Sequence, residues 1–275
     1  MKIKDVEKGG VSVREYFDLD KQIQHLVIDK SLLISHKDLK VIEEVLIDQS
    51  YQYFVNCSKI KQAEYFEPNL KMYKTAPFHE WCDYFAMDKK VCKHLIGNLV
   101  DFEQTINSRI SHYLSGLMAR NELMDYEQNE IILIISQMRD RKDVQFSRYK
   151  GEETWNYVSK MTFGEMKQLV FWLYENQLDI YLKVIHGYSF MRKNVKKRFD
   201  ELNRLRNSLF HLVPLSIYLT KGSVRNRKLN NNERKKVVRW LSKRSASMEM
   251  KQAIDNICFY ADNYVKIKNS LRNVD

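Results

Sequence analysis

The stretch Arg204-Leu205-Arg206-Asn207-Ser208-Leu209-Phe210-His211 decides how the rest of the sequence is interpreted. It places an arginine, a polar residue directly after it, and a histidine five positions after that arginine. Apolar residues recur around it at helical spacing, which predicts a helix over residues 193–213. The polar residues near the end of this helix are therefore the first candidates for a functional site.

Geometry limits what one copy of this helix can do. At about 100° per residue, Arg206 and His211 are ~140° apart around the helix axis, so on a regular helix they cannot face the same atom. Two arrangements remove the conflict. Pro214 breaks the helix and turns His211 in a new direction, or two copies of the helix face each other, which requires a dimer.

The residues around the motif are strongly basic. Residues 191–240 contain fifteen Lys or Arg and three Asp or Glu, a net charge of +12, whereas the whole chain of 275 residues carries +11. A concentrated positive charge attracts polyanions, and nucleic acid is the first candidate. A solvated basic surface and an anionic membrane surface remain alternatives. The residues expected to contact RNA phosphates are Arg192, Lys193, Lys196, Lys197, Arg198, Arg225, Arg227, Lys228, Arg234, Lys235 and Lys236.

Composition predicts an all-α protein. Only 8 Gly and 3 Pro occur in the chain, and 44% of its residues are hydrophobic, which favours long helices around a real core. The sequence has neither an apolar run long enough to span a bilayer nor a signal-like N-terminus, so a cytoplasmic protein without membrane contact is expected. The 4 cysteines and 7 histidines lack zinc-ligand spacing, and we expect no metal and no cofactor.

Two regions are predicted. Residues 1–75 form an N-terminal helical region, in which Tyr51-Gln52-Tyr53-Phe54-Val55 either extends a helix or forms a short strand, and residues 56–77 are mostly connection. Residues 76–275 form a helical domain that includes the basic segment 191–240. Its strongest signal is an apolar stripe that predicts one long helix over residues 78–118.

Glu103 interrupts that stripe. It lies about 40° from Leu99 around the helix, where an unpaired carboxylate is expensive to bury. Glu103 therefore either meets a cation inside the fold or lines a polar cleft. A structural Glu–Arg pair and a functional carboxylate both satisfy this condition.

Several stretches together resemble a known family. They are Phe17-Asp18-Leu19-Asp20-Lys21-Gln22-Ile23, Ser50-Tyr51-Gln52-Tyr53-Phe54-Val55-Asn56, Met87-Asp88 with Leu95 and Phe102-Glu103-Gln104-Thr105-Ile106, and Arg206-Asn207-Ser208-Leu209-Phe210-His211. In this order they resemble the Abi family of bacterial abortive-infection proteins (AbiD/AbiF type), which belong to the HEPN group of helical RNA-acting domains. The resemblance covers most of residues 15–215.

The resemblance implies a HEPN-like helical bundle with an N-terminal helical extension, and a homodimer with the motif helices apposed. It also implies metal-independent RNA cleavage in an anti-phage or toxin–antitoxin role, controlled by a structured noncoding RNA.

The residue types suit that chemistry: His211 moves a proton near neutral pH, and Arg206 stabilises charge on phosphoryl oxygens. Asn207 orients the imidazole or holds a phosphate oxygen, and Glu103 pairs with Arg206. The expected products carry 2′,3′-cyclic phosphate and 5′-OH ends. Each of these residues taken alone also has an ordinary structural explanation, and the alternative is a non-catalytic protein that holds a noncoding RNA in a HEPN-like dimer.

Overall fold

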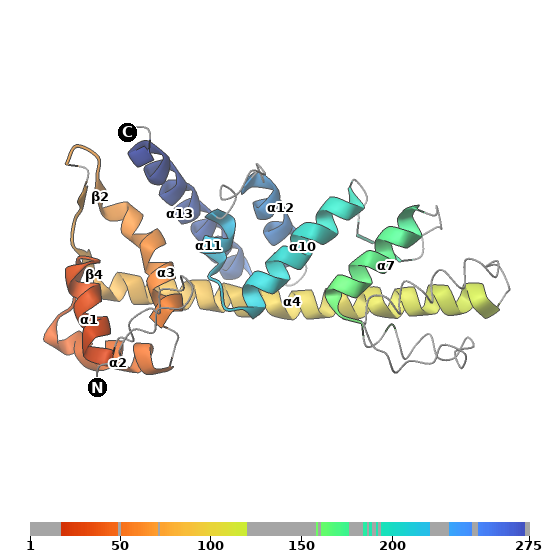
Figure 1. Ribbon diagram of the computed structural model, residues 1–275, viewed down its shortest axis with the longest axis horizontal. Helices are drawn as coiled ribbons and strands as arrows, with labels where there is room; N and C mark the ends of the chain where they lie inside the picture. The colour runs from red at the N-terminus through yellow and green to blue at the C-terminus, as the bar shows by residue number, and fades with distance from the viewer. Residues whose placement is uncertain are drawn as a thin grey trace, which may run out of the picture. The chain divides into compact units, whose positions relative to one another are not determined.

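The computed structural model describes residues 18–48, 51–70, 72–119, 158, 161–175, 184–185, 187–188, 191, 194–220, 231–243 and 247–272. Within these residues the protein is mostly helical, as the composition predicts, and the fold is all-α with two very small strand pairs (Figure 1). The chain divides into two compact units, Met1–Phe85 and Ala86–Asp275. The division falls inside the long helix α4, about ten residues after the predicted boundary at residue 75.

The first unit consists of short elements around an aromatic core. Its described elements are α1 (Leu19–Ile28), β1 (Leu32–Leu33), the 3-10 helix His36–Asp38, α2 (Leu39–Asp48), α3 (Tyr51–Gln62), the 3-10 helix Ala63–Tyr65, β2 (Phe66–Glu67), β3 (Met72–Tyr73), β4 (Ala76–Pro77) and the start of α4 (Phe78–Ala119). β1 pairs with β4 in parallel, and β2 pairs with β3 in antiparallel fashion.

Aromatic contacts explain why the start of α4 belongs to this unit. The fully buried ring of Phe54 on α3 lies 6.3 Å from the rings of Phe78 and Trp81 and 5.5 Å from that of Phe85. Buried aromatic rings contribute a large share of the apolar area in a small core. The unit therefore extends to Phe85, because the first turns of α4 complete its core.

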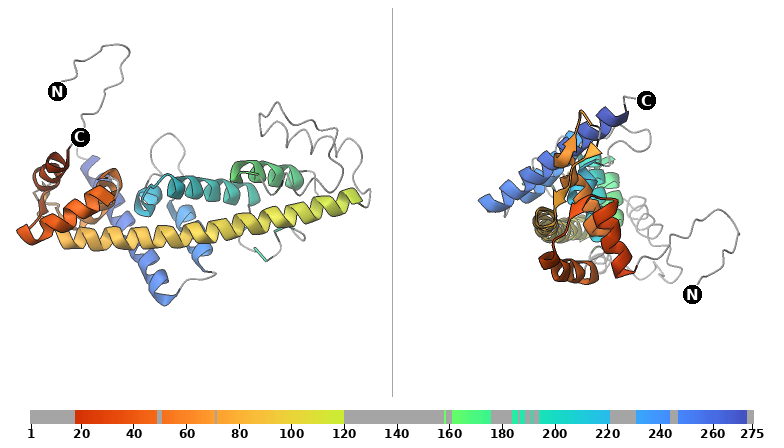
Figure 2. Two further views of the ribbon diagram at one scale, coloured as in Figure 1. Left: turned by 90° about the horizontal axis from the view of Figure 1, so that it is seen from below. Right: turned by 90° about the vertical axis from the view of Figure 1, so that its left-hand side faces the viewer.

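The second unit contains the rest of α4 and the helices that pack on it. These are α7 (Phe163–Glu175), α10 (Val195–Phe210), α11 (Leu215–Thr220), α12 (Asn231–Ser242) and α13 (Met248–Arg272). Helices α7 and α10 lie at an oblique angle to α4 (Figures 1 and 2). Helix α10 also packs against α7, α11 and α12, and α11 packs on α13.

The ring of Phe102 on α4 is the centre of this second core. It contacts four rings from different parts of the chain, those of Phe163, Tyr188, Phe199 and Trp240, at centroid distances of 6.4, 5.2, 5.8 and 5.7 Å. Phe199 lies on α10 and Trp240 on α12, so this cluster fixes α10 against α4 and α12. The face of α10 that carries Leu202, Leu205 and Leu209 is buried in the same core.

Candidate functional site

The last turn of α10 carries Arg206, whose side chain is held from two sides. Its Nε lies 3.8 Å from Oε2 of Glu103 on α4, and its Cζ lies 4.7 Å from the ring centroid of Phe210. The pairing of Glu103 with a cation that the apolar stripe predicts is thus present in the structure. The carboxylate and the aromatic ring together restrict where the guanidinium can point.

This ion pair is loose. A separation of 3.8 Å is too long for a hydrogen bond, and the enclosed Nε of Arg206 has no hydrogen-bond acceptor among the described residues. Burial raises the pKa of Glu103, and the positive charge of Arg206 only partly opposes that effect. Although this Nε is enclosed, 29% of the Arg206 side chain remains exposed, and a guanidinium has further N–H donors that can bind an anion.

His211 lies immediately after α10 and is exposed, as is Asn207 one turn earlier. The helix ends at Phe210, earlier than the predicted end at residue 213 and four residues before Pro214. The N–H of Leu212 donates to the carbonyl of Leu209 at 3.1 Å, and the N–H of Val213 donates to that of Ser208 at 2.8 Å. These two bonds form a Schellman motif, which ends the helix before the proline does.

The Schellman motif requires a left-handed residue, and here that residue is Leu212, with a φ of 52°. Glycine is the usual occupant, because a Cβ is strained in this conformation. Leu212 is also 66% exposed, so burial of its side chain does not offset the strain. The turn that presents His211 is therefore held by its hydrogen bonds at a local conformational cost.

The structure does not join His211 to Arg206. Among the described residues no hydrogen bond or ion pair connects the two side chains. Arg206 is engaged by Glu103 and Phe210, whereas His211 begins the turn toward α11. The dimer that would bring an arginine and a histidine together from two copies stays a prediction.

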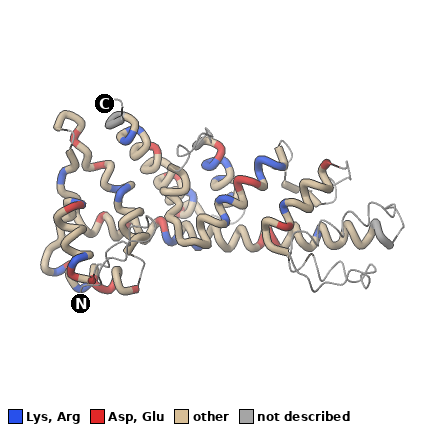
Figure 3. Tube along the Cα trace, in the orientation of Figure 1, with Lys and Arg blue, Asp and Glu red and all other residues tan. Residues whose placement is uncertain are grey.

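Five of the predicted RNA-contacting residues, Arg192, Lys193, Arg225, Arg227 and Lys228, lie outside the described residues. The other six are on α10 and α12, which carry both positive and negative residues (Figure 3). Five of these six are ion-paired: Lys196 with Glu175, Arg198 and Lys236 with Glu233, Arg234 with Glu201, and Lys235 with Asp262. Lys197 is exposed and has no carboxylate partner among the described residues.

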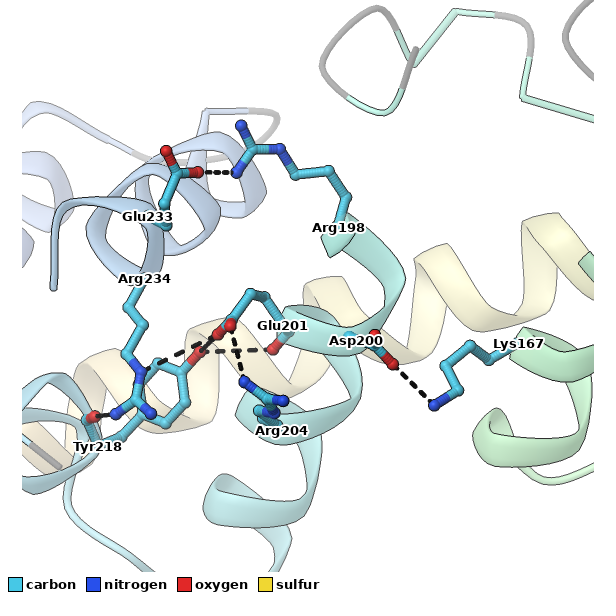
Figure 4. A network of polar contacts seen from close by, with 8 residues as sticks. All are labelled: Lys167, Arg198, Asp200, Glu201, Arg204, Tyr218, Glu233 and Arg234. Carbon is cyan, nitrogen blue, oxygen red and sulfur yellow. Dashed lines mark hydrogen bonds and ion pairs between the residues drawn. The ribbon is translucent and has the colours of Figure 1, made fainter. Parts of the chain in front are cut away.

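Arg234 and Lys235 lie in the interior, which the charge count did not predict. Arg234 packs over the ring of Tyr218 at 4.9 Å, donates to the carbonyl of Tyr218 and lies 3.9 Å from the carboxylate of Glu201 (Figure 4). Both cations are less than 10% exposed. Little of either side chain is accessible, and both make contacts within the fold, so their contact with RNA phosphates stays a prediction that the burial does not favour.

Glu201 is the centre of the network in Figure 4, and its carboxylate is almost fully buried. It accepts a 2.9 Å hydrogen bond from Arg204 and one of 3.4 Å from the Tyr218 hydroxyl. Burial is the main reason why the pKa of Tyr218 is raised, with the charge of Glu201 adding to it. The tyrosine therefore remains a neutral donor, and the network ties α10 to α11 and α12.

Asp88 on α4 is a second buried carboxylate that sequence reasoning did not single out as a site residue. It is 0% exposed and accepts hydrogen bonds from the backbone N–H groups of Leu215 and Ser216 at 3.1 and 3.2 Å. The Cys92 thiol also donates to it at 3.3 Å. Asp88 thus binds the first turn of α11, directly after the turn that contains His211.

Three further observations concern the chain as described. No group of three or more His, Cys, Asp or Glu in the described residues is arranged to hold a metal ion. None of the described helices is long and apolar enough to cross a membrane. Comparison of the chain with models of protein families, with curated proteins and with solved structures finds no significant match.

Proposed function

We propose that this protein is a metal-independent endoribonuclease with a HEPN-like helical bundle, and that Arg206, Asn207, His211 and Glu103 form its site. The resemblance of the sequence to Abi proteins supports a role as an anti-phage abortive-infection effector or toxin, controlled by a structured noncoding RNA. The observation that carries the proposal is the contrast along α10. Lys196, Arg198 and Arg204 each donate a hydrogen bond to a carboxylate, whereas the carboxylate of Glu103 lies 3.8 Å from Arg206, beyond hydrogen-bonding distance. Arg206 also lies beside the exposed Asn207 and His211.

The chemistry needs no metal. The 2′-oxygen of a ribose attacks the adjacent phosphorus, the bond from phosphorus to O5′ breaks, and the products carry a 2′,3′-cyclic phosphate and a 5′-OH. One group removes the 2′-OH proton and another protonates O5′, which imidazole rings do well near neutral pH. The guanidinium of Arg206 stabilises the charge that develops on the phosphoryl oxygens.

A homodimer fits this chemistry, because two copies supply two His211 rings, one as base and one as acid. A dimer also removes the geometric conflict that arises because Arg206 and His211 point in different directions from one copy of α10. In such a dimer the Arg206 of one copy and the His211 of the other act on the same phosphate. Asn207, exposed one turn before His211, holds a phosphate oxygen or orients the ring.

The second candidate is a non-catalytic protein that holds a noncoding RNA. The observation that favours it is the surroundings of His211: among the described residues no side chain hydrogen-bonds its ring, whereas a general base is usually oriented by a third group. In this case Arg206 and Lys197 are RNA contacts, and His211 contributes no chemistry.

Cleavage assays in EDTA decide between the two candidates. Purified protein, stripped of bound RNA, is incubated with end-labelled RNA, and wild type is compared with His211→Ala. The matched control is His36→Ala, because His36 is also exposed but lies in the first unit. Cutting by wild type and the control but not by His211→Ala, with cyclic-phosphate ends and unchanged RNA affinity, supports the ribonuclease. Tight binding without cutting by all three supports the RNA-binding protein.

A further inference from the structure

Helix α11 is too short to be stable alone, yet it lies directly after the turn that contains His211. It has six residues, Leu215–Thr220, far fewer than an isolated helix needs in water. Its first intrahelical bond runs from the N–H of Tyr218 to the carbonyl of Pro214 at 3.0 Å, which makes Pro214 the N-cap. Proline has no side-chain oxygen, so it cannot accept the free N–H groups of the first turn.

Asp88 supplies the missing acceptor from another part of the chain. Its two carboxylate oxygens each accept one N–H of the first turn of α11, Oδ1 from Leu215 and Oδ2 from Ser216. A carboxylate at a helix N-terminus also interacts favourably with the helix dipole. Because Asp88 is completely buried, water cannot replace these two bonds.

The other end of α11 is held by the opposite charge. Arg234 of α12 donates to the carbonyl of Tyr218, which is in the last turn of the helix. A cation at a helix C-terminus complements the dipole in the same way as an anion at the N-terminus. A buried carboxylate and a buried guanidinium therefore clamp α11 at its two ends.

The clamp fixes the turn between α10 and α11. That turn contains only His211, Leu212, Val213 and Pro214. Its start is fixed by the Schellman bonds to Ser208 and Leu209, and its end by Asp88. Helix α4 thus contacts the chain on both sides of the turn, with Glu103 beside Arg206 and Asp88 at the first turn of α11.

We infer that Asp88 is a positioning residue for His211, which fixes the place of the histidine by capping α11 and without touching the RNA. This inference deepens the proposed ribonuclease function and rests on it for its catalytic consequence. Its structural part, that the capping bonds of Asp88 determine the environment of His211, holds independently of any activity.

The test uses the full-length protein with Asp88→Asn, which keeps one acceptor oxygen and replaces the other by an amide that faces an N–H donor. The control is Asp101→Asn, an exposed aspartate on the same helix. The first measurement is the NMR spectrum of the histidine rings, with the His211 signals assigned from the His211→Ala spectrum. We expect Asp88→Asn to shift and broaden the His211 signals and leave those of His36 unchanged, and Asp101→Asn to change neither.

The second measurement is RNA cleavage. A displaced catalytic group loses up to about 10²-fold in rate, so we expect kcat to fall by that order in Asp88→Asn while KM stays within about twofold. Rescue distinguishes positioning from general damage. Adding Pro214→Ser provides a local N-cap acceptor for α11, and it should restore both the His211 signals and most of kcat.

The outcomes separate the two claims. If wild type does not cut RNA, the proposed function fails, and the NMR spectra still decide the positioning of His211. If folded Asp88→Asn keeps the His211 signals and the cleavage rate of wild type, the inference is overturned and the proposed function stands. Asp88→Glu, which keeps a carboxylate but displaces it, is measured in parallel. If Asp88→Asn does not fold, unchanged His211 signals in Asp88→Glu overturn the inference and shifted signals support it.

Discussion

The two ends of α10 each place an arginine near a glutamate from another helix, and the two pairs differ. Near the start, Arg198 donates a hydrogen bond to Glu233 of α12. In the last turn, Arg206 stays 3.8 Å from Glu103 of α4, beyond hydrogen-bonding distance. The pKa values of the two glutamates shift in opposite directions: hydrogen bonding from Arg198 lowers that of Glu233, and burial raises that of Glu103.

The difference separates a structural region of α10 from a region that is open to a ligand. From Val195 to Arg204 every charged side chain except Lys197 is paired, and at the paired cations a new anion would have to displace an existing carboxylate. From Arg206 onward, Arg206 is loosely paired, and Asn207 and His211 are exposed. The four predictions below test whether the two regions differ in stability and in activity as this division requires.

The largest loss of stability is expected from Arg234→Ala. The substitution removes one of the two cations beside the buried carboxylate of Glu201, and it leaves a cavity next to the ring of Tyr218. Removing one partner of a buried ion pair costs about 3–5 kcal/mol, measured as the free energy of unfolding in urea. The control is Lys236→Ala, whose side chain is 58% exposed and whose loss should cost less than about 1 kcal/mol. Equal effects of the two substitutions would contradict the buried network.

Arg206→Ala is expected to reduce the cleavage rate strongly and the stability only slightly. Cleavage should fall by about 10²–10³-fold, because a donor to the charged phosphoryl oxygens is lost. The free energy of unfolding should change by only about 1 kcal/mol, as for a partly exposed ion pair. Arg206→Lys keeps the charge but not the planar pair of donors, and it should recover only part of the rate. If Arg206→Ala is instead as unstable as Arg234→Ala, the last turn of α10 belongs to the structural region.

The two glutamates should respond to pH in opposite ways. The pKa of Glu233 is lowered, so its contribution to stability is present above the ordinary value of 4.5 and is lost as the pH falls through the lowered value. The pKa of Glu103 is raised, so its contribution is full below 4.5 and is lost as the pH rises through the raised value.

Urea unfolding of Glu233→Gln and Glu103→Gln across this range measures the difference. Relative to wild type, Glu233→Gln should become less stable as the pH rises, and Glu103→Gln should become more stable. If the free energies of unfolding of the two variants changed with pH in the same way, the two pairs would not differ electrostatically.

The smallest effect is expected from Leu212→Gly. Glycine adopts the left-handed conformation without strain, so the variant should be more stable by about 0.5–1 kcal/mol after the entropy of the unfolded chain is counted. Leu212→Ala keeps the strained Cβ and should bring no such gain. A loss of stability in the glycine variant would show that the exposed leucine makes contacts that outweigh its strain.

Periodic patterns predicted the helices well, and they failed where a segment is short or a contact is distant. The stripe over residues 78–118 became α4, which ends at Ala119. Residues 51–55 belong to the helix α3, whose buried positions continue to Cys57 and Ile60. The two-residue strands have no period of their own, and they fall in segments where no strand was predicted, including the residues interpreted as connection.

The site was predictable only in part. The position of Glu103 within an apolar stripe predicted either a cation partner or a polar cleft, and the structure provides Arg206 as the cation. The burial of Arg234 was not predictable from a charge count, because the count cannot show which cations meet a carboxylate inside the fold. The role of Asp88 could not be predicted from the sequence either. Its partners lie 127 and 128 residues further along the chain, and no local pattern connects them.

That sequence separation has a consequence for how the protein is made. A ribosome that adds about 5–20 residues per second needs roughly 6–25 seconds to proceed from Asp88 to Leu215. The second charge of the clamp, Arg234, is added later still. The turn around His211 therefore cannot reach its final geometry until α12 has emerged from the ribosome. In the ribonuclease proposed above, this order keeps the site inactive beside the messenger RNA and ribosome that produce it until α12 has been synthesised.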